Sequence, residues 1–539
     1  MTIKHQLIKA KPYYREANNG VARKTYEVQQ KMAINQLKTG ALLSYILIGL
    51  GSVISILYTP IMLRLLGQSE YGLYSLVGSV IAYLGLFNFG FGSAYIKYFS
   101  VYKTNNDKEG LASLNGMFLL IFSALGLVAV AAGLVLAVNS DIIFGNKLTV
   151  YELSKAKVLM IIMVINTAIT FPAIVFNSYI SAIEKFVFQK VLLLVKTIAS
   201  PLVMIPVLMM GYGSVGMAIV VTLLGLIIEI INVWFCFRKA NLQFIFKKFD
   251  LKLLKELFIF SSFIFMNLLV NQINWNVDRF IIGWFRGTVE VAVYSIAAQL
   301  NTYYLTFSTA ISNVYIPRVN QMVARKCSNW ELTELFARLG RLQFIVLVLV
   351  IELLIFFGMP FISLWAGVNY SRSYYMALIL MIPVTIPLIQ NLGIEIQRAK
   401  NQHKFRSWVY LFIALGNILI SIPLTKIYGG IGAAIGTSIA LTIGNILIMN
   451  WYYHTKVGLD IRYFSKQIAL LLPALLIPAI AGYLFMYYIN LNYVPNFILY
   501  ATVFILIFSV SMWFIGLNKY EKELISNPIK KMIGKFTNK

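Results

Sequence analysis

The sequence predicts an all-α polytopic membrane protein with about 14 transmembrane helices. Of its 539 residues, 59% are hydrophobic and only 12% are charged, and the mean hydropathy is +0.76. A soluble protein of this length would need far more charge on its surface. Polar or glycine-rich breaks also divide the chain into apolar segments of about 20 residues, the length of a helix that crosses a bilayer.

These segments define the expected organisation of the chain. We expect a basic tail at 1–39, an N-terminal lobe at 40–236, a basic linker at 237–254, a C-terminal lobe at 255–453, two further helices within 465–517 and a basic tail at 518–539. Residues 1–39 lack the apolar core and cleavage site of a signal peptide, which favours a cytoplasmic tail. The individual spans are predicted near residues 40–64, 71–96, 114–137, 157–180, 188–210, 213–236, 255–283, 289–316, 342–365, 375–397, 407–425, 429–453, 465–488 and 497–517.

The basic residues predict the orientation of these spans. The net charge is +26, but the 46 lysines and arginines lie in short segments between apolar spans, which favours contact with anionic lipids and not with nucleic acid. With both termini in the cytoplasm, most of them fall on the cytoplasmic side, as the positive-inside rule requires. The external segments then hold Arg64, Lys147, Lys155, Arg279, Arg286, Arg372 and Lys426.

The first six spans resemble the next six in parallel order. The segment YGSVGMAI at 212–219 returns as YGGIGAAI at 428–435, and Gly67 matches Gly283 at the same spacing. At nearly that spacing, Tyr74, Tyr95 and Ile96 match Tyr294, Tyr315 and Ile316. Such repeats predict two pseudo-symmetric six-helix lobes with a substrate site between them, followed by two extra helices.

The segment 267–286 carries the strongest polar signal inside a span. Asn267, Asn271, Asn274 and Asp278 recur at helical spacing, and Gln272, Arg279 and Arg286 form an adjacent stripe. Polar groups in hydrocarbon are costly unless they face protein or a wet cavity, so we expect this helix to line a polar central space. The alternative is a structural ladder of interhelical hydrogen bonds, with Arg279 reaching the headgroups.

No motif predicts an enzyme, a metal site or a cofactor. The segment GYGSVG at 211–216 has the spacing of a dinucleotide fingerprint but follows an apolar helix instead of a strand. The three histidines are far apart, and Cys236 and Cys327 are both expected on the cytoplasmic side, where a disulfide is disfavoured.

Several short motifs resemble those of bacterial polysaccharide flippases. LGQSEYGLY at 66–74 and FNFGFGSAYIK at 87–97 are similar to the first helical hairpin of the O-antigen, capsule and exopolysaccharide exporters, which belong to the multidrug/oligosaccharidyl-lipid/polysaccharide superfamily. DRFIIG at 278–283, PR at 317–318 and YGGIGAA at 428–434 resemble later signatures of that family. The resemblance covers about residues 40–517. It implies fourteen helices and translocation of undecaprenyl-diphosphate-linked oligosaccharide across the bacterial cytoplasmic membrane, with H⁺ or Na⁺ as a coupling ion and other polysaccharide-assembly proteins as partners.

The residue chemistry suits such a substrate. A diphosphate needs cations in a low-dielectric cavity, and sugars need amides, hydroxyls and aromatic faces. Lys196 lies about 12 Å along its helix, deep in the membrane. The candidate cations are Arg279, Lys196, Arg64, Lys97 and Arg318, of which the last three could instead reach toward the headgroups. The candidate sugar contacts are Asn271, Asn274, Trp275, Tyr303 and Tyr304. The coupling candidates are Asp278, Glu229, Glu352 and Glu395, each of which could instead be a salt-bridge partner.

Two other classes of function compete with this interpretation. Another transporter of the superfamily, either a lipid II-type flippase or a drug/cation antiporter, would share the fold, but the basic excess disfavours cationic drugs. A membrane polysaccharide polymerase or ligase would need a sizeable external loop with catalytic Arg or His, and the predicted external loops are short.

Overall fold

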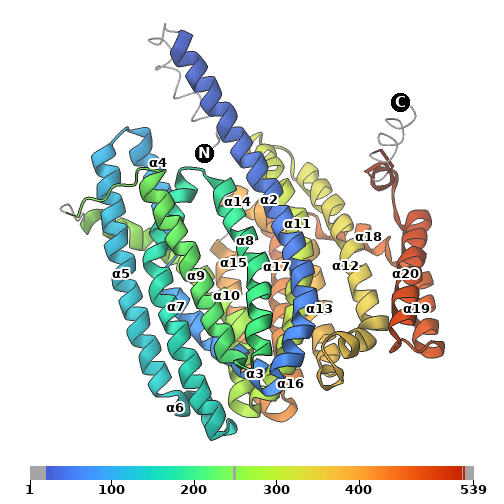
Figure 1. Ribbon diagram of the computed structural model, residues 1–539. Coiled ribbons are helices and arrows are strands. Elements are labelled where there is room, and N and C mark those ends of the chain that lie inside the picture. Colours follow the sequence, from blue (N-terminus) through green and yellow to red (C-terminus); the bar gives the residue numbers. More distant parts are fainter. Residues whose placement is uncertain (1–19, 247–250, 403, 525, 528–539) are drawn as a thin grey trace, which may run out of the picture.

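The computed structural model describes residues 20–246, 251–402, 404–524 and 526–527, and within them the chain is almost entirely helical, without a strand (Figure 1). Twelve of the described helices are long and apolar enough to cross a membrane. The bent pair α13–α14 raises this number to 13. The prediction of an all-α polytopic membrane protein is therefore confirmed. The tails predicted at 1–39 and 518–539 and the linker at 237–254 lie partly outside the described residues.

The N-terminal group of helices comprises residues 20–238. Its first span is α2, and its second consists of α3 and α4, joined by one turn of 3₁₀ helix. The elements are α2 (Gly20–Leu66), α3 (Gln68–Leu84), η2 (Gly85–Asn88), α4 (Phe91–Thr104), α5 (Lys108–Val138), α6 (Ser140–Phe144), η3 (Gly145–Lys147), α7 (Val150–Ala182), α8 (Phe186–Met209) and α9 (Gly213–Arg238).

The C-terminal group comprises residues 251–457, and its helices occupy the positions predicted for spans seven to twelve. Its elements are α10 (Leu251–Arg286), α11 (Thr288–Ala324), α12 (Asn329–Trp365), η4 (Val368–Tyr370), α13 (Ser373–Ile389), α14 (Asn391–Ala399), α15 (Lys404–Tyr428), α16 (Gly430–Leu441), η5 (Thr442–Ile448), α17 (Met449–Tyr452) and η6 (Tyr453–Val457). The final two spans consist of α18 (Ile461–Ala469), η7 (Leu472–Leu475), α19 (Leu476–Tyr488), α20 (Val494–Ser511) and η8 (Met512–Gly516).

Two of the predicted spans differ from simple apolar helices. The helix α11 is 37 residues long but too polar to count among the apolar spans, because it carries Gln299, Asn301 and a run of hydroxyl side chains. Pro383 and Pro387 lie inside α13, and the chain bends by 41° between α13 and α14. Proline removes backbone donors and disrupts the helix, so it accounts for a bend at this position.

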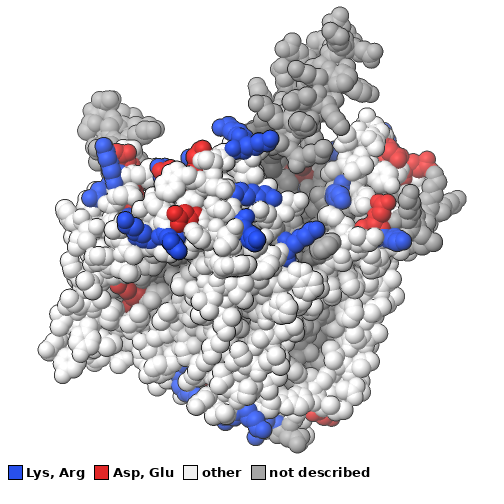
Figure 2. Space-filling model, turned by 180° about the vertical axis from the view of Figure 1, so that it is seen from behind, with Lys and Arg blue, Asp and Glu red and all other residues white. Residues whose placement is uncertain are grey.

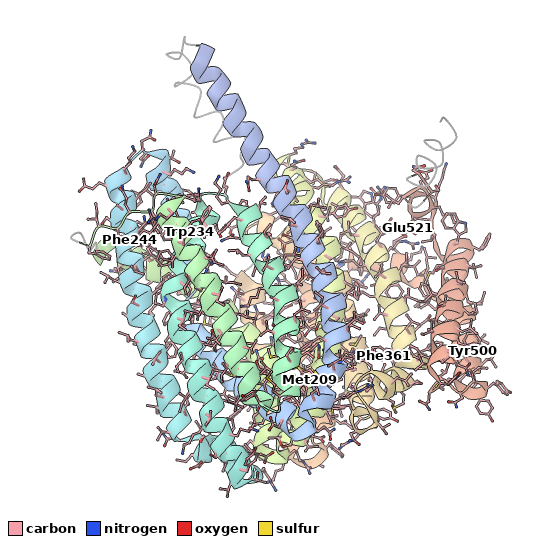
Figure 3. The ribbon with its side chains drawn as sticks, in the orientation of Figure 1. Met209, Trp234, Phe244, Phe361, Tyr500 and Glu521 are labelled. Atoms are coloured by element: carbon pink, nitrogen blue, oxygen red, sulfur yellow. The ribbon has the colours of Figure 1, made fainter. Side chains whose placement is uncertain are left out.

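The ends of the helices divide the molecule into two faces. The terminal face carries the connections at 105–107, 183–185, 325–328 and 458–460, and the opposite face carries those at 139–149, 210–212, 366–372 and 489–493. In Figure 1 both described chain ends lie at the terminal face. Figure 3 shows the two faces, with Met209 near the opposite face and Trp234 and Phe244 near the terminal face. Lys and Arg gather along the terminal face in Figure 2, above a broad band with almost no charge.

An acidic side chain in the first turn of α3 holds the N-terminal group together at the opposite face. The carboxylate of Glu70 accepts a hydrogen bond of 2.8 Å from the backbone N–H of Ser214, at the start of α9. It also forms an ion pair with Lys155 of α7. A carboxylate at a helix N-terminus satisfies free backbone donors and interacts favourably with the helix dipole.

The C-terminal group repeats this arrangement. Glu290, in the first turn of α11, accepts a hydrogen bond of 2.9 Å from the N–H of Gly430 at the start of α16, and it forms a 3.1 Å ion pair with Arg372 beside α13. The repeat aligns Gly67 with Gly287, which are the N-caps of α3 and α11 with φ of 77° and 81°. The sequence comparison had paired Gly67 with Gly283, but Gly283 lies inside α10, so the correct offset is four residues longer.

Helix α3 joins the two groups, packing against both α10 and α11. Gly72 permits this close approach, because a Cβ at that position would overlap the backbone carbonyl oxygen of Thr288. Beside it, Glu152 of α7 accepts hydrogen bonds of 2.6 Å from the hydroxyls of Ser69 and Thr288. The two groups are therefore tightly joined at the opposite face.

Candidate functional site

A cavity of about 360 Å³ lies between the two groups of helices, and we call it the Arg279 cavity. Helices α2 and α3 supply one wall, and α10 and α11 supply the other. Hydroxyl groups dominate its lining, and Arg279 is its one charged side chain. The lining residues are Ser55, Tyr58, Thr59, Met62, Tyr71, Ser75, Arg279, Ser295, Gln299, Thr302 and Tyr303.

Arg279 is only partly engaged by other side chains. Its Nη1 donates a 2.9 Å hydrogen bond to the amide oxygen of Asn276, one turn earlier on α10. Its Nε is buried and has no hydrogen-bond partner, and no acidic residue in the described part of the chain forms an ion pair with it. A buried guanidinium N–H without an acceptor is costly, so this arrangement favours an anionic ligand.

A small hydrogen-bond network of α2 and α11 lies beside Arg279. The Nε2 of Gln299 donates to the hydroxyl of Tyr303 at 2.7 Å and to that of Thr59 at 3.0 Å, and it lies 3.3 Å from the hydroxyl of Ser55. The bonds to Ser55 and Thr59 cross between the two groups of helices. The cavity therefore combines one cation with amide and hydroxyl groups, the types of group that bind phosphate and sugars.

Asp278 does not share this cavity, although it adjoins Arg279 in the sequence. Its carboxylate is 2% exposed and accepts 2.6 Å hydrogen bonds from the hydroxyls of Tyr294 and Thr437, inside the C-terminal group. Consecutive residues on a helix point about 100° apart, which places the two charges on different sides of α10. Asn274 is buried on the same side as Asp278, so the stripe expected to line the central space instead turns partly into the core.

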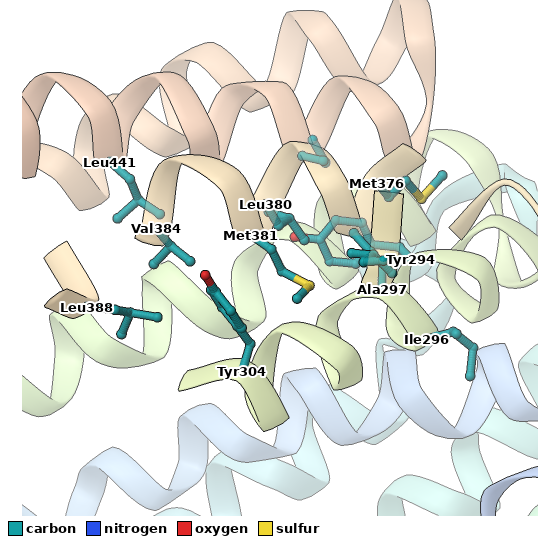
Figure 4. Packing of buried hydrophobic residues seen from close by; sticks show 14 of the residues in the cluster. Tyr294, Ile296, Ala297, Tyr304, Met376, Leu380, Met381, Val384, Leu388 and Leu441 are labelled. Atoms are coloured by element: carbon teal, nitrogen blue, oxygen red, sulfur yellow. The ribbon is translucent and has the colours of Figure 1, made fainter. Parts of the chain in front are cut away.

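The other predicted sugar contacts are divided among three environments. Tyr303 lines the Arg279 cavity. Tyr304 is fully buried, and its hydroxyl lies 2.6 Å from that of Thr385. Figure 4 shows its ring among Met381, Val384 and Leu388, so Tyr304 belongs to the packed core. Asn271 and Trp275 lie on the exposed side of α10.

The remaining predicted cations are spread over the molecule. Lys196 is partly exposed on α8 and is not among the residues that line the Arg279 cavity. Arg64, at the end of α2, reaches the carbonyl oxygen of Leu364 at 3.5 Å, across to the C-terminal group. Lys97 lines a second cavity between α4, α10 and α15, and Arg318 is exposed on α11.

Arg286, from the second polar stripe, has a structural role. Its guanidinium donates to the backbone carbonyl oxygens of Thr425, Lys426 and Ile427 at 3.3, 2.7 and 2.7 Å. These carbonyls are at the C-terminus of α15, where they lack partners within the helix. The guanidinium therefore caps α15 at the opposite face.

The predicted coupling residues other than Asp278 differ in how well they are satisfied. The carboxylate of Glu229 accepts hydrogen bonds from the amides of Asn177 and Asn232. Glu395 forms a 2.8 Å ion pair with Arg398. Glu352, on α12, is 6% exposed, and its Oε2 has no hydrogen-bond partner. Glu352 is therefore the least satisfied of these acids.

Sequence reasoning missed the contribution of α2 and of Gln299 to the cavity. Ser55 and Thr59 are spaced four residues apart, as are Gln299 and Tyr303, and this spacing places each pair on one face of a helix. That periodicity was a usable signal, but hydroxyls in a transmembrane helix often bond to their own backbone, as Thr59 does to the carbonyl of Ser55.

Comparisons with known proteins agree with this architecture. The chain is 23% identical over 397 residues to a Shigella flexneri protein named "Putative O-antigen transporter", covering 72% of this chain and 91% of that protein. The fold of the present protein is similar to that of the lipid II flippase MurJ in an inward closed conformation. The TM-score is 0.70 at 19% identity, and the match covers 87% of this chain and 98% of MurJ.

A second solved structure has the same fold at a greater distance. An inward-facing multidrug resistance transporter of the MATE family gives a TM-score of 0.60 at 13% identity, covering 77% of this chain and 99% of that one. Residues 37–323 match the family described as "Polysaccharide biosynthesis protein", more than half of the chain. This protein is therefore a member of the polysaccharide biosynthesis protein family.

Proposed function

We propose that this protein is a flippase that moves an undecaprenyl-diphosphate-linked oligosaccharide across the bacterial cytoplasmic membrane for surface polysaccharide assembly. The observation that carries the proposal is Arg279, whose buried Nε lacks an acceptor in a cavity shared by the two groups of helices. Arginine presents a planar fork of donors that matches two phosphate oxygens. A diphosphate would supply the acceptors that the cavity lacks.

The rest of the lining fits the sugar end of such a substrate. Hydroxyl, amide and phenol groups from both walls surround Arg279, and the phenol of Tyr303 is among them. Sugars bind to surfaces of this kind, on which polar groups fix the orientation of the ligand and aromatic faces pack against its rings. The cavity has a volume of only about 360 Å³, so we infer that a whole glycan would be accommodated only as the two groups separate.

Transport would proceed by alternating access, with the two groups of helices rocking about the central cavity. At the opposite face they are joined by the hydrogen bond that the hydroxyl of Thr288 on α11 donates to Glu152 on α7. In addition, the indole N–H of Trp365 donates a 2.7 Å bond to the carbonyl oxygen of Ile56. Opening this face requires these bonds to break. Separately, the buried Glu352 provides a carboxylate that could take up the coupling proton. The repeated Glu70 and Glu290 arrangements support two lobes that move as units.

We further propose that the terminal face is cytoplasmic, because Lys and Arg gather there. In cells, a membrane-impermeant maleimide should label an introduced Tyr212→Cys, since Tyr212 is 63% exposed at the opposite face. It should not label Lys239→Cys at the terminal face until the membrane is permeabilised. The native Cys236 is buried, but Cys327 is partly exposed at the terminal face, so both variants are made in a Cys327→Ser background. Labelling of Lys239→Cys in intact cells would refute this orientation.

The proposed transport activity is tested by deleting the gene in its native strain. The strain should lose its surface polysaccharide and accumulate lipid-linked oligosaccharide in the inner leaflet, and a plasmid copy should restore export. Normal surface polysaccharide at wild-type levels would contradict the proposal.

A lipid II-type flippase is the second candidate, favoured by the fold likeness to the structure of the lipid II flippase MurJ at a TM-score of 0.70. The same deletion separates the two functions, because loss of lipid II export would arrest cell-wall synthesis and not surface polysaccharide alone. A cationic-drug antiporter is disfavoured, because the one charged side chain lining the central cavity is a cation.

A further inference from the structure

A second and larger cavity, of about 770 Å³, opens between the two groups of helices at the terminal half of the bundle. We call it the lateral cavity. Helix α4 forms its N-terminal wall, whereas α10 and α15 form its C-terminal wall. Its lining residues are Lys97, Tyr98, Glu256, Ile259, Phe260, Ile264, Met266, Asn267, Asn401, Lys404, Ser407, Trp408 and Leu411.

Each wall of the lateral cavity contributes one lysine. Lys97 comes from α4, and its Nζ lies 4.2 Å from the centroid of the Phe260 ring, a cation–π contact. Lys404 is exposed at the first turn of α15. Neither forms an ion pair with a described residue. The one carboxylate in the lining, that of Glu256, accepts a 3.3 Å hydrogen bond from the hydroxyl of Tyr98. Because the lining has two lysines and one carboxylate, it carries a net positive charge.

The rest of the lining is mostly apolar and suits a hydrocarbon chain. Ile259 is 59% exposed on α10 and Trp408 is 62% exposed on α15. Leu411 follows Trp408 at a spacing of three residues and lies on the same side of α15. Two cations beside an apolar trough recognise an amphiphile with an anionic headgroup.

We propose that the lateral cavity is the site where the lipid diphosphate substrate is loaded, with its phosphates between Lys97 and Lys404 and its isoprenoid chain against Phe260, Trp408 and Leu411. This inference rests on the proposed flippase function. This cavity takes one cation from each group of helices, so an anionic headgroup bound between them would respond to their relative movement. Helix α10 also connects the two cavities, because Asn267 and Arg279 are separated by about 18 Å along one continuous helix.

The test measures binding of a radiolabelled polyprenyl diphosphate to the purified full-length protein in phosphatidylcholine nanodiscs. The double variant Lys97→Gln/Lys404→Gln should bind at least about tenfold more weakly, because it removes both charge-assisted contacts to phosphate. Lys103→Gln is the matched control. Lys103 lies on the same helix, with its ammonium over Phe99 and outside the cavity, so its loss should leave the affinity unchanged. If the double variant fails to fold, Lys404→Gln alone still tests the site, because Lys404 is exposed and its replacement should not disturb the fold.

Three outcomes would overturn this proposal. One is unchanged affinity in a folded double variant. Another is displacement of the probe by phosphatidylglycerol at equal potency, which would make the cavity a phospholipid site. The third is equal competition by inorganic pyrophosphate, since the apolar trough would then contribute nothing. If polyprenyl diphosphate binds through both lysines but deletion of the gene leaves export intact, the proposed flippase function fails while this site stands.

Discussion

Replacing Arg279 with alanine should abolish polysaccharide export while the protein still folds and inserts. A cation inside the bilayer costs at least about 2.5–3.5 kcal/mol on insertion scales, so its removal should not harm the fold. Removing Arg279 does not leave Asp278 without partners, because that carboxylate accepts hydrogen bonds from Tyr294 and Thr437. The variant should therefore lose the anion site alone. Surface polysaccharide and protein level are measured together in the deletion strain.

Arg279→Lys should restore only part of the export, because a point charge lacks the bidentate fork of arginine. Lys196→Ala tests the second predicted cation, which does not line the Arg279 cavity. Arg318→Ala, at an exposed position on α11, is a control for loss of positive charge in general. Lys196→Ala should therefore leave export unchanged, and normal export by Arg279→Ala at wild-type protein levels would rule out a cationic-cavity mechanism through Arg279.

Replacing Arg341 with alanine should be the most destabilising change of a single charge in the described structure. Arg341 of α12 is 4% exposed and bonds both carboxylate oxygens of Glu521, at 2.7 and 2.9 Å, and Glu521 is 1% exposed. It also donates to the carbonyl oxygens of Gln467 and Gly516. Figure 3 shows Glu521 beyond α20, near the terminal face. Removing one member of a buried pair costs about 3–5 kcal/mol because the other charge remains unpaired.

Denaturant unfolding in detergent micelles measures this loss of free energy. Arg338→Ala is the matched control, three residues earlier on the same helix. Its exposed ion pair with Glu334 and its cation–π contact with Tyr520, 5.1 Å from the ring centroid, should together contribute about 1 kcal/mol. The double variant Arg341→Met/Glu521→Leu should lose less than the two single changes added together, since neither charge is left alone. Equal losses for Arg338→Ala and Arg341→Ala would show that the buried pair does not hold the final two spans to α12.

The membrane fold was predictable because it depends on composition averaged over long segments. Each of the 14 predicted spans coincides with a helix or a short run of helices. Helix α11 is informative because it is too polar to count among the apolar spans. Its amide and hydroxyl groups line the Arg279 cavity, so the feature that weakens its hydropathy is the feature that forms the site. Pro383 and Pro387 both lie in the predicted span 375–397, which the structure divides into α13 and α14 with a bend of 41°.

The candidate site was predictable only where the cost of burying a charge is large. Arg279 was identified because a cation in a span demands an explanation. The environments of Tyr303 and Tyr304 were not distinguishable, because adjacent residues point about 100° apart and the sequence does not show which side of α11 meets the core. The same ambiguity put Asp278 in the central space. Hydroxyls such as that of Thr59 carry too small a burial cost to stand out.

The contact between Gly72 and the carbonyl oxygen of Thr288 makes the opposite face sensitive to a single methyl group. The Cβ of an alanine at position 72 would hold α3 away from α11, so the two groups of helices could no longer meet there. The substitution would leave Arg279 itself in place. A protein held apart in this way would be a trapped conformer that is open at the opposite face, suitable for structure determination and for raising antibodies that recognise it.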